Sequence, residues 1–378
     1  MSRLKELLKP LAEDGSALTR EQAASVLEEI LTGSVPEVET AALLTVMATR
    51  GEQAPELAGF VDVMRRHATP LPFTNVERSH LVDCVGTGGG GPQTFNISCG
   101  AALVAAAAGA LVAKHGNRAV TSRCGAADVL EALGVPIDLP PELAVQCLRE
   151  TGFVFLYAQL YHPAMKALGP LRRALGFRTI FNLVGPLTNP AHARIQVIGV
   201  LAPSRVLLVG RALAALGAKR AFVVHGTDGI DELTTTGESV VARIEEKIAE
   251  NIAASATGEA VLNPGGPGSS GRPSLGTPEL KAARITPEMA GLPRTTLDHF
   301  IGGDVATNKA LLYDVLTGVP GARRDIVLLN AAAVLVAAGL AGDLKQGVAM
   351  GAEAIDSGQA AATLEKLRRF GAMHAAKR

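Results

Sequence analysis

Tryptophan is absent from this 378-residue chain, and aromatic residues make up only 3% of it. Proteins that bind single-stranded nucleic acid stack bases on aromatic side chains over a basic groove. The 36 basic and 36 acidic residues of the chain cancel to a formal net charge of zero. Because both the stacking groups and an overall positive field are lacking, the composition predicts no nucleic-acid partner.

Cysteine is scarce as well. The four cysteines are Cys84, Cys99, Cys124 and Cys147, and no two of them form a C-x-x-C pair. Their spacing gives no support to a zinc site or a thioredoxin-like motif. We therefore expect reduced thiols and a cytoplasmic protein.

Long apolar runs are missing. The alanine-rich stretch 101–113, "AALVAAAAGALVA", is shorter than the ~20 residues that span a bilayer. The opening "MSRLKELLKPLAEDG" is amphipathic and lacks the apolar core of a signal peptide. These features predict no membrane partner.

What the chain does have is a hydrophobic content of 48%, which is ample for a buried core. Apolar residues recur at three- and four-residue spacing through the first quarter, with a capping box at Thr19 and Gln22. We expect a small helical domain over residues 1–75, to which a segment near 165–190 is joined. The helices are expected at 3–13, 19–33, 35–51 and 54–68.

From Leu81 onward, short apolar runs rich in β-branched residues alternate with helical patterns. Strands are expected at 81–87, 111–116, 195–201 and 220–226, and helices at 98–110, 126–134, 204–217, 304–318, 323–339, 344–358 and 359–371. This alternation predicts the α/β class, with a mostly parallel central sheet flanked by helices over residues 76–378. The Gly/Pro/Ser-rich stretch 255–278 is interpreted as a mobile insertion.

Five glycines crowd the stretch "DCVGTGGGGPQTFNIS", residues 83–98, between an expected strand and an expected helix. A glycine run removes Cβ atoms and leaves backbone N–H groups free, and the following helix adds its positive dipole end. Together these favour a bound phosphate. A tight turn without a ligand remains the alternative.

The same loop matches the dinucleotide pattern G-x-G-x-x-G, which is a weak signal alone. A nicotinamide enzyme would place an acidic residue at the end of the next strand, where this chain has Lys114 and His115. Two cationic or polar side chains at that place favour a more highly phosphorylated ligand. The P-loop pattern of ATP-hydrolysing enzymes is absent from the sequence.

Five blocks carry a resemblance to a known family: "GTGGGGPQTFNIS", "KHGNRAVTSRCGAADVLEALG", "YHPAMKALGPLRRALGFRTIFNLVGPLTNP", "HGTDGIDELTTTGES" and "RRDIVLLNAAA". In order and spacing they resemble the anthranilate phosphoribosyltransferases over nearly the whole chain. The resemblance implies transfer of a phosphoribosyl group from phosphoribosyl pyrophosphate (PRPP) to the amine of anthranilate, with release of pyrophosphate, in tryptophan biosynthesis. It also implies a helical domain beside an α/β domain and a homodimer.

The resemblance implies roles for individual residues. The residues expected at PRPP are Gly86, Gly89, Gly90, Thr94, Asn96, Ile97, Ser98, Cys99, Lys114, His115, Gly116, Asn117, Arg118 and Ala126. Those expected at anthranilate are Gly86, His115, Asn117, Arg172 and Gly185, with Pro186 and His162 shaping the slot. Ser98, Asp231 and Glu232 are expected to bind Mg²⁺, two ions per subunit, because carboxylates and hydroxyls suit this hard cation.

Each role has an ordinary structural alternative. Asp231 and Glu232 can be a solvated pair on a turn, Asn96 can simply cap a helix, and His115 can be a structural imidazole. No strong base is demanded, since the anthranilate amine is a neutral nucleophile at pH 7. Arg173, beside Arg172, is interpreted as a surface residue.

Three positions depart from the family. Gly90 stands where the family usually has Asp, Cys99 where Thr is usual, and Ala126 where Ser is common. The first change removes a carboxylate near the expected magnesium, and it predicts an altered magnesium dependence that reversion of Gly90→Asp would test.

Three other functions stay open at this point. A nucleoside phosphorylase of the same fold would need no metal pair, so Asp231 and Glu232 disfavour it. A non-catalytic relative would show a basic surface and would lose Asn117 and Arg172. A nicotinamide oxidoreductase is the least favoured.

Overall fold

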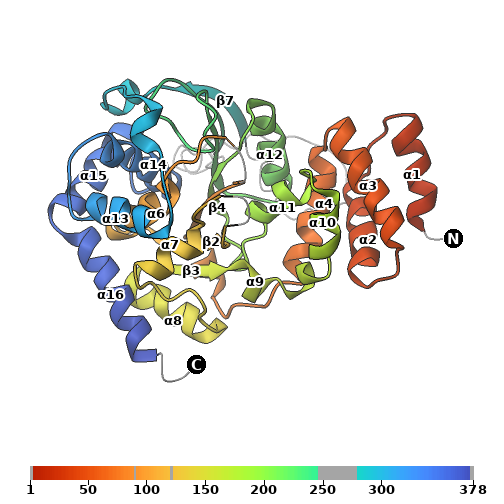
Figure 1. Cartoon of the computed structure of the whole chain (residues 1–378), viewed down its shortest axis with the longest axis horizontal. Helices are drawn as coiled ribbons and strands as arrows, with labels where there is room; N and C mark the ends of the chain where they lie inside the picture. Colours follow the sequence, from red (N-terminus) through yellow and green to blue (C-terminus); the bar gives the residue numbers. More distant parts are fainter. Residues whose placement is uncertain (1–2, 89–90, 120–121, 246–278, 375–378) are drawn as a thin grey trace, which may run out of the picture.

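The computed structural model describes residues 3–88, 91–119, 122–245 and 279–374. Helices α1 to α4 gather at one end of the molecule and the C-terminal helices α13 to α16 at the other, with a sheet between them (Figure 1). The stretch 255–278, expected to be an insertion, lies outside the described residues.

The helices of the first half are α1 (Arg3–Glu13), α2 (Arg20–Leu31), α3 (Glu37–Arg50), α4 (Ala54–Arg66), α5 (Asn75–Arg78), α6 (Ile97–Ala107), α7 (Ala126–Ala132), α8 (Pro141–Thr151), α9 (Ala158–Tyr161), α10 (Gly169–Leu175) and α11 (Phe181–Leu187). Those of the second half are α12 (Pro203–Ala215), α13 (Val305–Leu316), α14 (Ala322–Ala338), α15 (Leu344–Asp356) and α16 (Gln359–His374), with 3₁₀ turns at Pro163–Lys166, Pro287–Ala290 and Leu297–Phe300. The strands are β1 (Leu81–Gly86), β2 (Leu111–Gly116), β3 (Phe153–Tyr157), β4 (Ile195–Gly199), β5 (Arg220–Gly226), β6 (Ser239–Glu245) and β7 (Glu279–Ile285).

The N-terminal helices begin and end where local chemistry favours it. The Thr19 side chain accepts from the Gln22 N–H at the start of α2, and Gln22 accepts from Thr19 in return, so the expected capping box is confirmed. Between α3 and α4 the carboxylate of Glu56 is wholly buried and accepts from Arg50 at 2.6 and 2.7 Å. This pair ties the two helices together.

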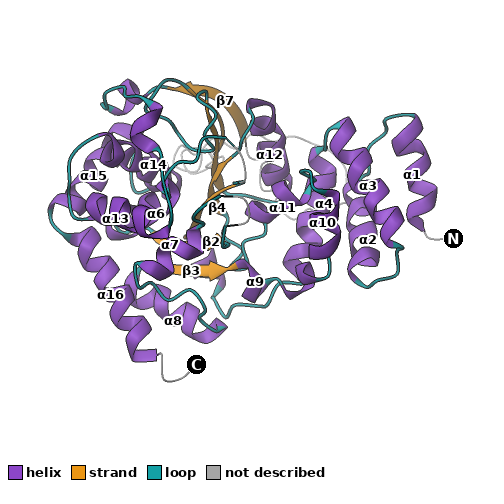
Figure 2. Cartoon of the chain, in the orientation of Figure 1, coloured by secondary structure: helices purple, strands orange, loops and turns teal. Residues whose placement is uncertain are grey.

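Within the described residues the sheet has seven strands in the order β3-β2-β1-β4-β5-β6-β7. Neighbours from β3 to β5 are parallel, whereas β6 pairs antiparallel with β5 and β7 with β6. Helices lie on both sides of it (Figure 2). The predicted α/β class with a mostly parallel sheet is therefore confirmed, although β3, β6 and β7 were not expected from the sequence.

The sheet opens between β1 and β2. Ladder partners join Leu81 to Leu111 and Val82 to Val112, and the pairing between these two strands stops there. β1 stays paired with β4 as far as Gly86, and β2 stays paired with β3 as far as Gly116. We call the unpaired part, residues 83–86 facing 113–116, the seam. It lies at the carboxyl ends of the strands, where open α/β sheets bind ligands.

Two apolar clusters pack around the sheet. One contains α6, α8, α14 and residues from β1 to β3. The other combines the N-terminal helices with α11, α12 and the inner residues of β4 and β5. The N-terminal helices therefore share a core with one face of the sheet through α12 and α11. Among the described helices, none has the length and apolar character to cross a bilayer.

Candidate functional site

Glycines at the ends of β1 and β4 let the loop after β5 approach the sheet edge. A Cβ on Gly86 would lie 2.3 Å from Asp231 Oδ2, and one on Gly199 would lie 1.5 Å from the Asp231 carbonyl oxygen. Neither position has room for a side chain. The Gly88 N–H donates to Asp231 Oδ2 at 2.9 Å, so the start of the glycine loop is held by this carboxylate. Gly89 and Gly90 lie outside the described residues.

Asp231 and Glu232 lie side by side at this edge, each half-buried. Burial raises the pKa of Asp231. Burial and the neighbouring Asp231 raise the pKa of Glu232 to about 8, an effect that Lys114 and Ser98 oppose. Two carboxylates that repel each other in a partly dry site favour a bound cation. Since the donors are oxygens, the pair with the Ser98 hydroxyl fits Mg²⁺.

The start of α6 lies next to these carboxylates. Ser98 presents its N–H and hydroxyl to Glu232. Asn96 makes no side-chain cap. Its amide instead donates to the Cys124 carbonyl at 3.2 Å and accepts from Asn308 at 2.9 Å. Asn96 thus ties α6 to the segment before α7 and to α13. The side chains of Ile97 and Cys99 are buried in the apolar core, and only their backbone can face a ligand.

Lys114 is a buried cation in the middle of the site, with 1% of its surface exposed. Its ammonium donates to the Cys84 carbonyl and, at 3.3 Å, to Ser98 Oγ. Burial acts to lower its pKa, but the thiols and carboxylates around it outweigh this effect and raise the pKa. The side chain therefore supplies a permanent positive charge beside the Asp231–Glu232 pair.

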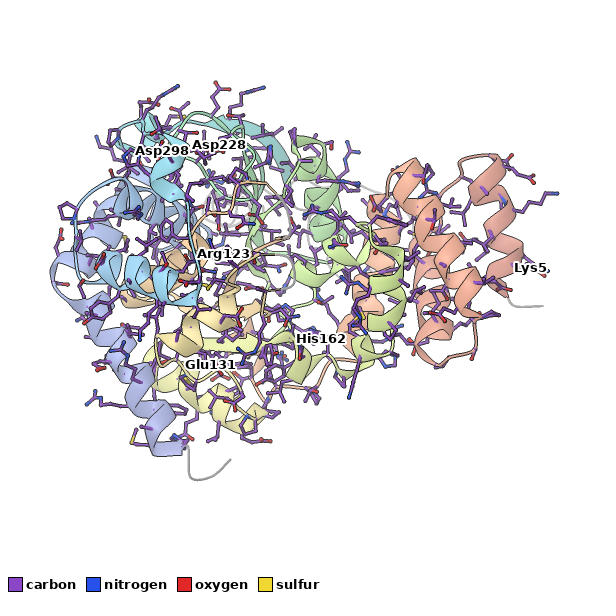
Figure 3. All side chains as sticks on the ribbon, in the orientation of Figure 1. Lys5, Arg123, Glu131, His162, Asp228 and Asp298 are labelled. Carbon is purple, nitrogen blue, oxygen red and sulfur yellow. The ribbon has the colours of Figure 1, made fainter. Side chains whose placement is uncertain are left out.

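His115 and His162 meet edge to face, with ring centroids 5.1 Å apart. Burial, together with His162 and Lys114, holds the pKa of His115 well below its usual value, while the nearby Gly185 backbone opposes this. Burial lowers the pKa of His162 to about 4. Both rings are neutral at pH 7, and His115 Nε2 and both His162 nitrogens lack hydrogen-bond partners within the described part of the chain. His162 lies on the side of the α/β part that faces the N-terminal helices (Figure 3).

Asp128 binds described residues on both sides of positions 120–121, in the segment between β2 and α7. Asp128 Oδ2 accepts from the Ala119 and Gly125 N–H groups, each at 2.9 Å. The Arg118 guanidinium donates to Asp128 at 3.0 Å and to Glu131 at 2.8 and 3.0 Å. The Arg118 charge is therefore already neutralised by the carboxylates of Asp128 and Glu131. A role of Arg118 at a phosphate remains a prediction.

Asn117, Gly116, Ala126 and Thr94 are the remaining residues predicted at PRPP. Asn117 is exposed, and its Oδ1 accepts from Arg118 N–H at 2.8 Å. A Cβ on Gly116 would lie 3.4 Å from the Cβ of Ala126, the first residue of α7. Thr94 pairs with Ile301 in an isolated bridge.

Arg172 and Gly185 come from the segment that packs on the N-terminal helices. The Arg172 guanidinium lies 5.6 Å from the Phe181 ring centroid, and burial lowers its pKa. The Arg172 guanidinium has no hydrogen-bond or ion-pair partner among the described residues, so it is free to bind an anionic group. A Cβ on Gly185 would meet nothing within 4 Å, so open space adjoins the helix there.

Sequence reasoning missed three polar residues at this edge. Asp83 and Asn189 are wholly buried at the seam. Arg178 donates to the Gly88 carbonyl at 3.0 Å and so links the glycine loop to the segment that carries Arg172 and Gly185, which we call the acceptor segment. A charged residue inside an otherwise apolar strand was the one available signal, and it applied to Asp83 alone.

Comparison with known proteins assigns this arrangement to a family. Residues 78–262 and 273–361 match the a/b domain of a glycosyl transferase family, and residues 5–68 match its helical bundle domain. Anthranilate phosphoribosyltransferases from Moorella thermoacetica and Anaeromyxobacter sp. are 44% and 46% identical, covering 93% and 94% of this chain and 94% and 95% of their own. The chain belongs to the anthranilate phosphoribosyltransferase family.

Solved structures agree with this membership. The anthranilate phosphoribosyltransferase of Thermus thermophilus has a TM-score of 0.81 at 39% identity, covering 98% of this chain and 99% of its own. The Saccharomyces cerevisiae enzyme, solved in complex with PRPP and Mg, has a TM-score of 0.79 at 24% identity, covering 98% of each chain. At that identity the likeness to the yeast enzyme shows the fold alone. The sequence-based resemblance to anthranilate phosphoribosyltransferases is confirmed.

Proposed function

We propose that this chain transfers the 5-phosphoribosyl group of PRPP to the amine of anthranilate and releases pyrophosphate, as a step of tryptophan biosynthesis. The observation that carries the proposal is the grouping of Asp231, Glu232, Ser98 and the buried Lys114 beside the glycine loop. A donor with two phosphate-bearing arms needs such a site, because both arms must be held while negative charge develops on the leaving group.

Ser98, Asp231 and Glu232 would hold Mg²⁺, for which we propose two ions per subunit. Bound there, the metal supplies positive charge to the pyrophosphate. The chain itself contributes the Lys114 ammonium, backbone N–H groups of the glycine loop, and the amino end of α6. The remaining predicted PRPP residues, including Gly89, Gly90, Thr94 and Arg118, stay part of this proposal.

Anthranilate would bind on the other side of the seam. The unpaired Arg172 guanidinium suits its carboxylate, and the space beside Gly185 suits a flat ring. His115 and His162 would orient the acceptor, and because burial lowers their pKa values they are poor proton acceptors at the start of the reaction. The amine attacks the ribose carbon directly, since it is already an uncharged nucleophile.

We also propose that the enzyme is a cytoplasmic homodimer with a helical domain at 1–75 and an α/β domain at 76–378. The family's usual pairing through helical domains supports the dimer. The neutral charge and the reduced, buried cysteines are consistent with the location.

One assay tests the reaction. Loss of anthranilate fluorescence is followed with PRPP present, with and without Mg²⁺, for the wild type and for Asp231→Asn combined with Glu232→Gln. Turnover that requires Mg²⁺ and falls at least about 100-fold in the double variant is expected. Turnover of nucleosides with inorganic phosphate, unaffected by chelation of metal, would instead support a phosphorylase.

A further inference from the structure

The seam between β1 and β2 is a place where two parallel strands with adjoining carboxyl ends do not bond to each other. Backbone N–H and C=O groups buried in a sheet need partners, and unpaired ones are costly. The groups of β2 that face the seam must therefore be satisfied by something other than the backbone of β1.

Two buried side chains supply those partners. Asp83 Oδ1 accepts from the His115 N–H at 3.0 Å. Asn189 Nδ2 donates to the Ala113 carbonyl at 2.8 Å, while its Oδ1 accepts from the Ala191 N–H at 2.8 Å. Asp83 and Asn189 are both 0% exposed, so these bonds are shielded from water. Lys114 spans the same seam in the opposite direction, from β2 to the Cys84 carbonyl of β1.

Asp83 is an unfavourable choice for this position if folding were its only role. Its second oxygen, Oδ2, has no hydrogen-bond partner within the described residues, and a buried carboxylate carries a large desolvation cost. Burial raises the pKa of Asp83 to about 6, although Asn189, the His115 N–H and Lys114 counter this. An apolar residue at this position would leave the buried His115 N–H without its acceptor, because the β1 backbone does not pair with β2 here.

We propose that Asp83 and Asn189 are positioning residues that hold β1 and β2 apart and fix the backbone of residues 113–115. They would thereby aim the Lys114 ammonium at the donor and the His115 ring at the acceptor. Asn189 adds a link to the acceptor segment, because it follows α11, which carries Gly185. The catalytic consequence of this inference rests on the proposed function. The bonds of Asp83 and Asn189 to the β2 backbone, which we call the brace, are a property of the free protein.

The test uses Asp83→Ala, which removes the acceptor, Asp83→Asn, which keeps an oxygen in its place, and Asn189→Ala. Thr151→Val is the matched control. Thr151 is also buried and bonds to the backbone, to the Cys147 and Phe153 carbonyls, but at the amino end of β3. Two measurements are made on each full-length variant: amide hydrogen exchange of the peptide spanning 112–117, and kcat and KM for each substrate.

Asp83→Ala and Asn189→Ala are expected to speed exchange at 112–117 and to lower kcat/KM by roughly 10- to 100-fold, the effect of misplacing groups by about an ångström. Asp83→Asn is expected to stay within about threefold of the wild type, because its carbonyl oxygen can still accept the bond. Thr151→Val should lower thermal stability without changing either measurement. If Asp83→Ala does not fold, Asn189→Ala is judged by the same criteria.

The proposal is overturned if Asp83→Ala or Asn189→Ala leaves exchange at 112–117 and kcat/KM unchanged. It is also overturned if Asp83→Asn is as impaired as Asp83→Ala, or if Thr151→Val loses activity to the same degree. A wild-type protein without transferase activity would refute the proposed function, whereas the exchange measurement would still decide whether the brace exists.

Discussion

Arg172 is a guanidinium that the fold leaves without a counter-charge among the described residues, at half burial beside the Phe181 ring. We predict that Arg172→Gln raises the KM for anthranilate by about 10- to 100-fold, the loss expected for a charge-assisted pair. The KM for PRPP should change little. Steady-state kinetics with each substrate varied in turn measures both.

The neighbouring arginine provides the control for this experiment. Arg173 is exposed, and Arg173→Gln should leave both KM values near those of the wild type. Equal effects of the two substitutions would show that net charge near α10, and no specific contact, governs acceptor binding.

His162 makes stability depend on pH. Burial lowers its pKa in the folded state to about 4 from the ordinary 6.5, so between these values the unfolded chain binds a proton that the folded chain does not. This contribution to stability is present above pH 6.5 and is lost as the pH falls towards 4. We predict that between pH 7 and pH 5 the wild type loses about 2 kcal/mol more than His162→Gln.

Urea unfolding of both proteins at the two pH values measures that difference. Because the carboxylates titrate in both proteins, their contribution to the pH dependence of stability cancels when the two proteins are compared. A difference that stays constant with pH would mean that the His162 imidazole binds a proton as readily in the folded chain as in the unfolded chain.

For individual residues, the sequence could predict which charged residues and glycines belong to the site, but it could not predict their contact partners. Asp231, Lys114 and Arg172 come from segments that the family resemblance had marked. Asp83, Asn189 and Arg178 were missed because their partners lie 32, 76 and 90 residues away. Single-sequence patterns carry no information about contacts at such separations.

Among the secondary-structure elements, the junction of α3 and α4 depends on one buried ion pair. Glu56 accepts from Arg50, from the Leu18 N–H and from the Gln53 N–H, all while wholly buried. We predict that Glu56→Ala lowers the free energy of unfolding by about 3 kcal/mol, because it strands the Arg50 charge and two backbone donors.

The exposed ion pair Lys9–Glu13 in α1 serves as the control for the buried pair. Its side chains are 75% and 64% exposed, and Lys9 Nζ lies 3.9 Å from Glu13 Oε2. Glu13→Ala should change stability by less than about 0.5 kcal/mol. Thermal and urea unfolding of both variants measure these changes. Similar losses of unfolding free energy in Glu56→Ala and Glu13→Ala would contradict the prediction that burial makes the Arg50–Glu56 pair more important.

Helices and strands whose ends are marked by local sequence, such as a capping residue or a glycine, could be predicted. The capping box of α2 and the glycine ends of β1 and β5 follow from local chemistry. The strand β3, "FVFLY", was missed because a short apolar run with no alternation cannot be told from buried helix by pattern alone. β6 and β7 were missed because their place is decided by antiparallel pairing, of β6 with β5 and of β7 with β6, and a local pattern does not show such pairing.

For the molecule as a whole, the shared core predicts cooperative unfolding. Buried residues of the N-terminal helices, α11, α12 and the sheet form one apolar cluster. We predict a single thermal transition for the full chain, and no stable fold for residues 76–378 alone, because the fragment would expose the inner faces of α11 and α12 to water. Calorimetry and circular dichroism of both proteins test this, and a soluble fragment with its own sharp transition would contradict it.

The antiparallel edge of the sheet also decides where the chain can be altered. Because β6 runs against β5, its last residues pair with the amino end of β5, Ile244 with Ala221, and Glu279 of β7 returns beside Glu245. Glu245 and Glu279, the described residues on either side of 246–278, therefore lie at the amino end of β5, opposite the sheet edge that holds the seam. An affinity tag, a fluorophore or a whole fused protein could be spliced there, giving a reporter-bearing enzyme whose kinetics match those of the parent.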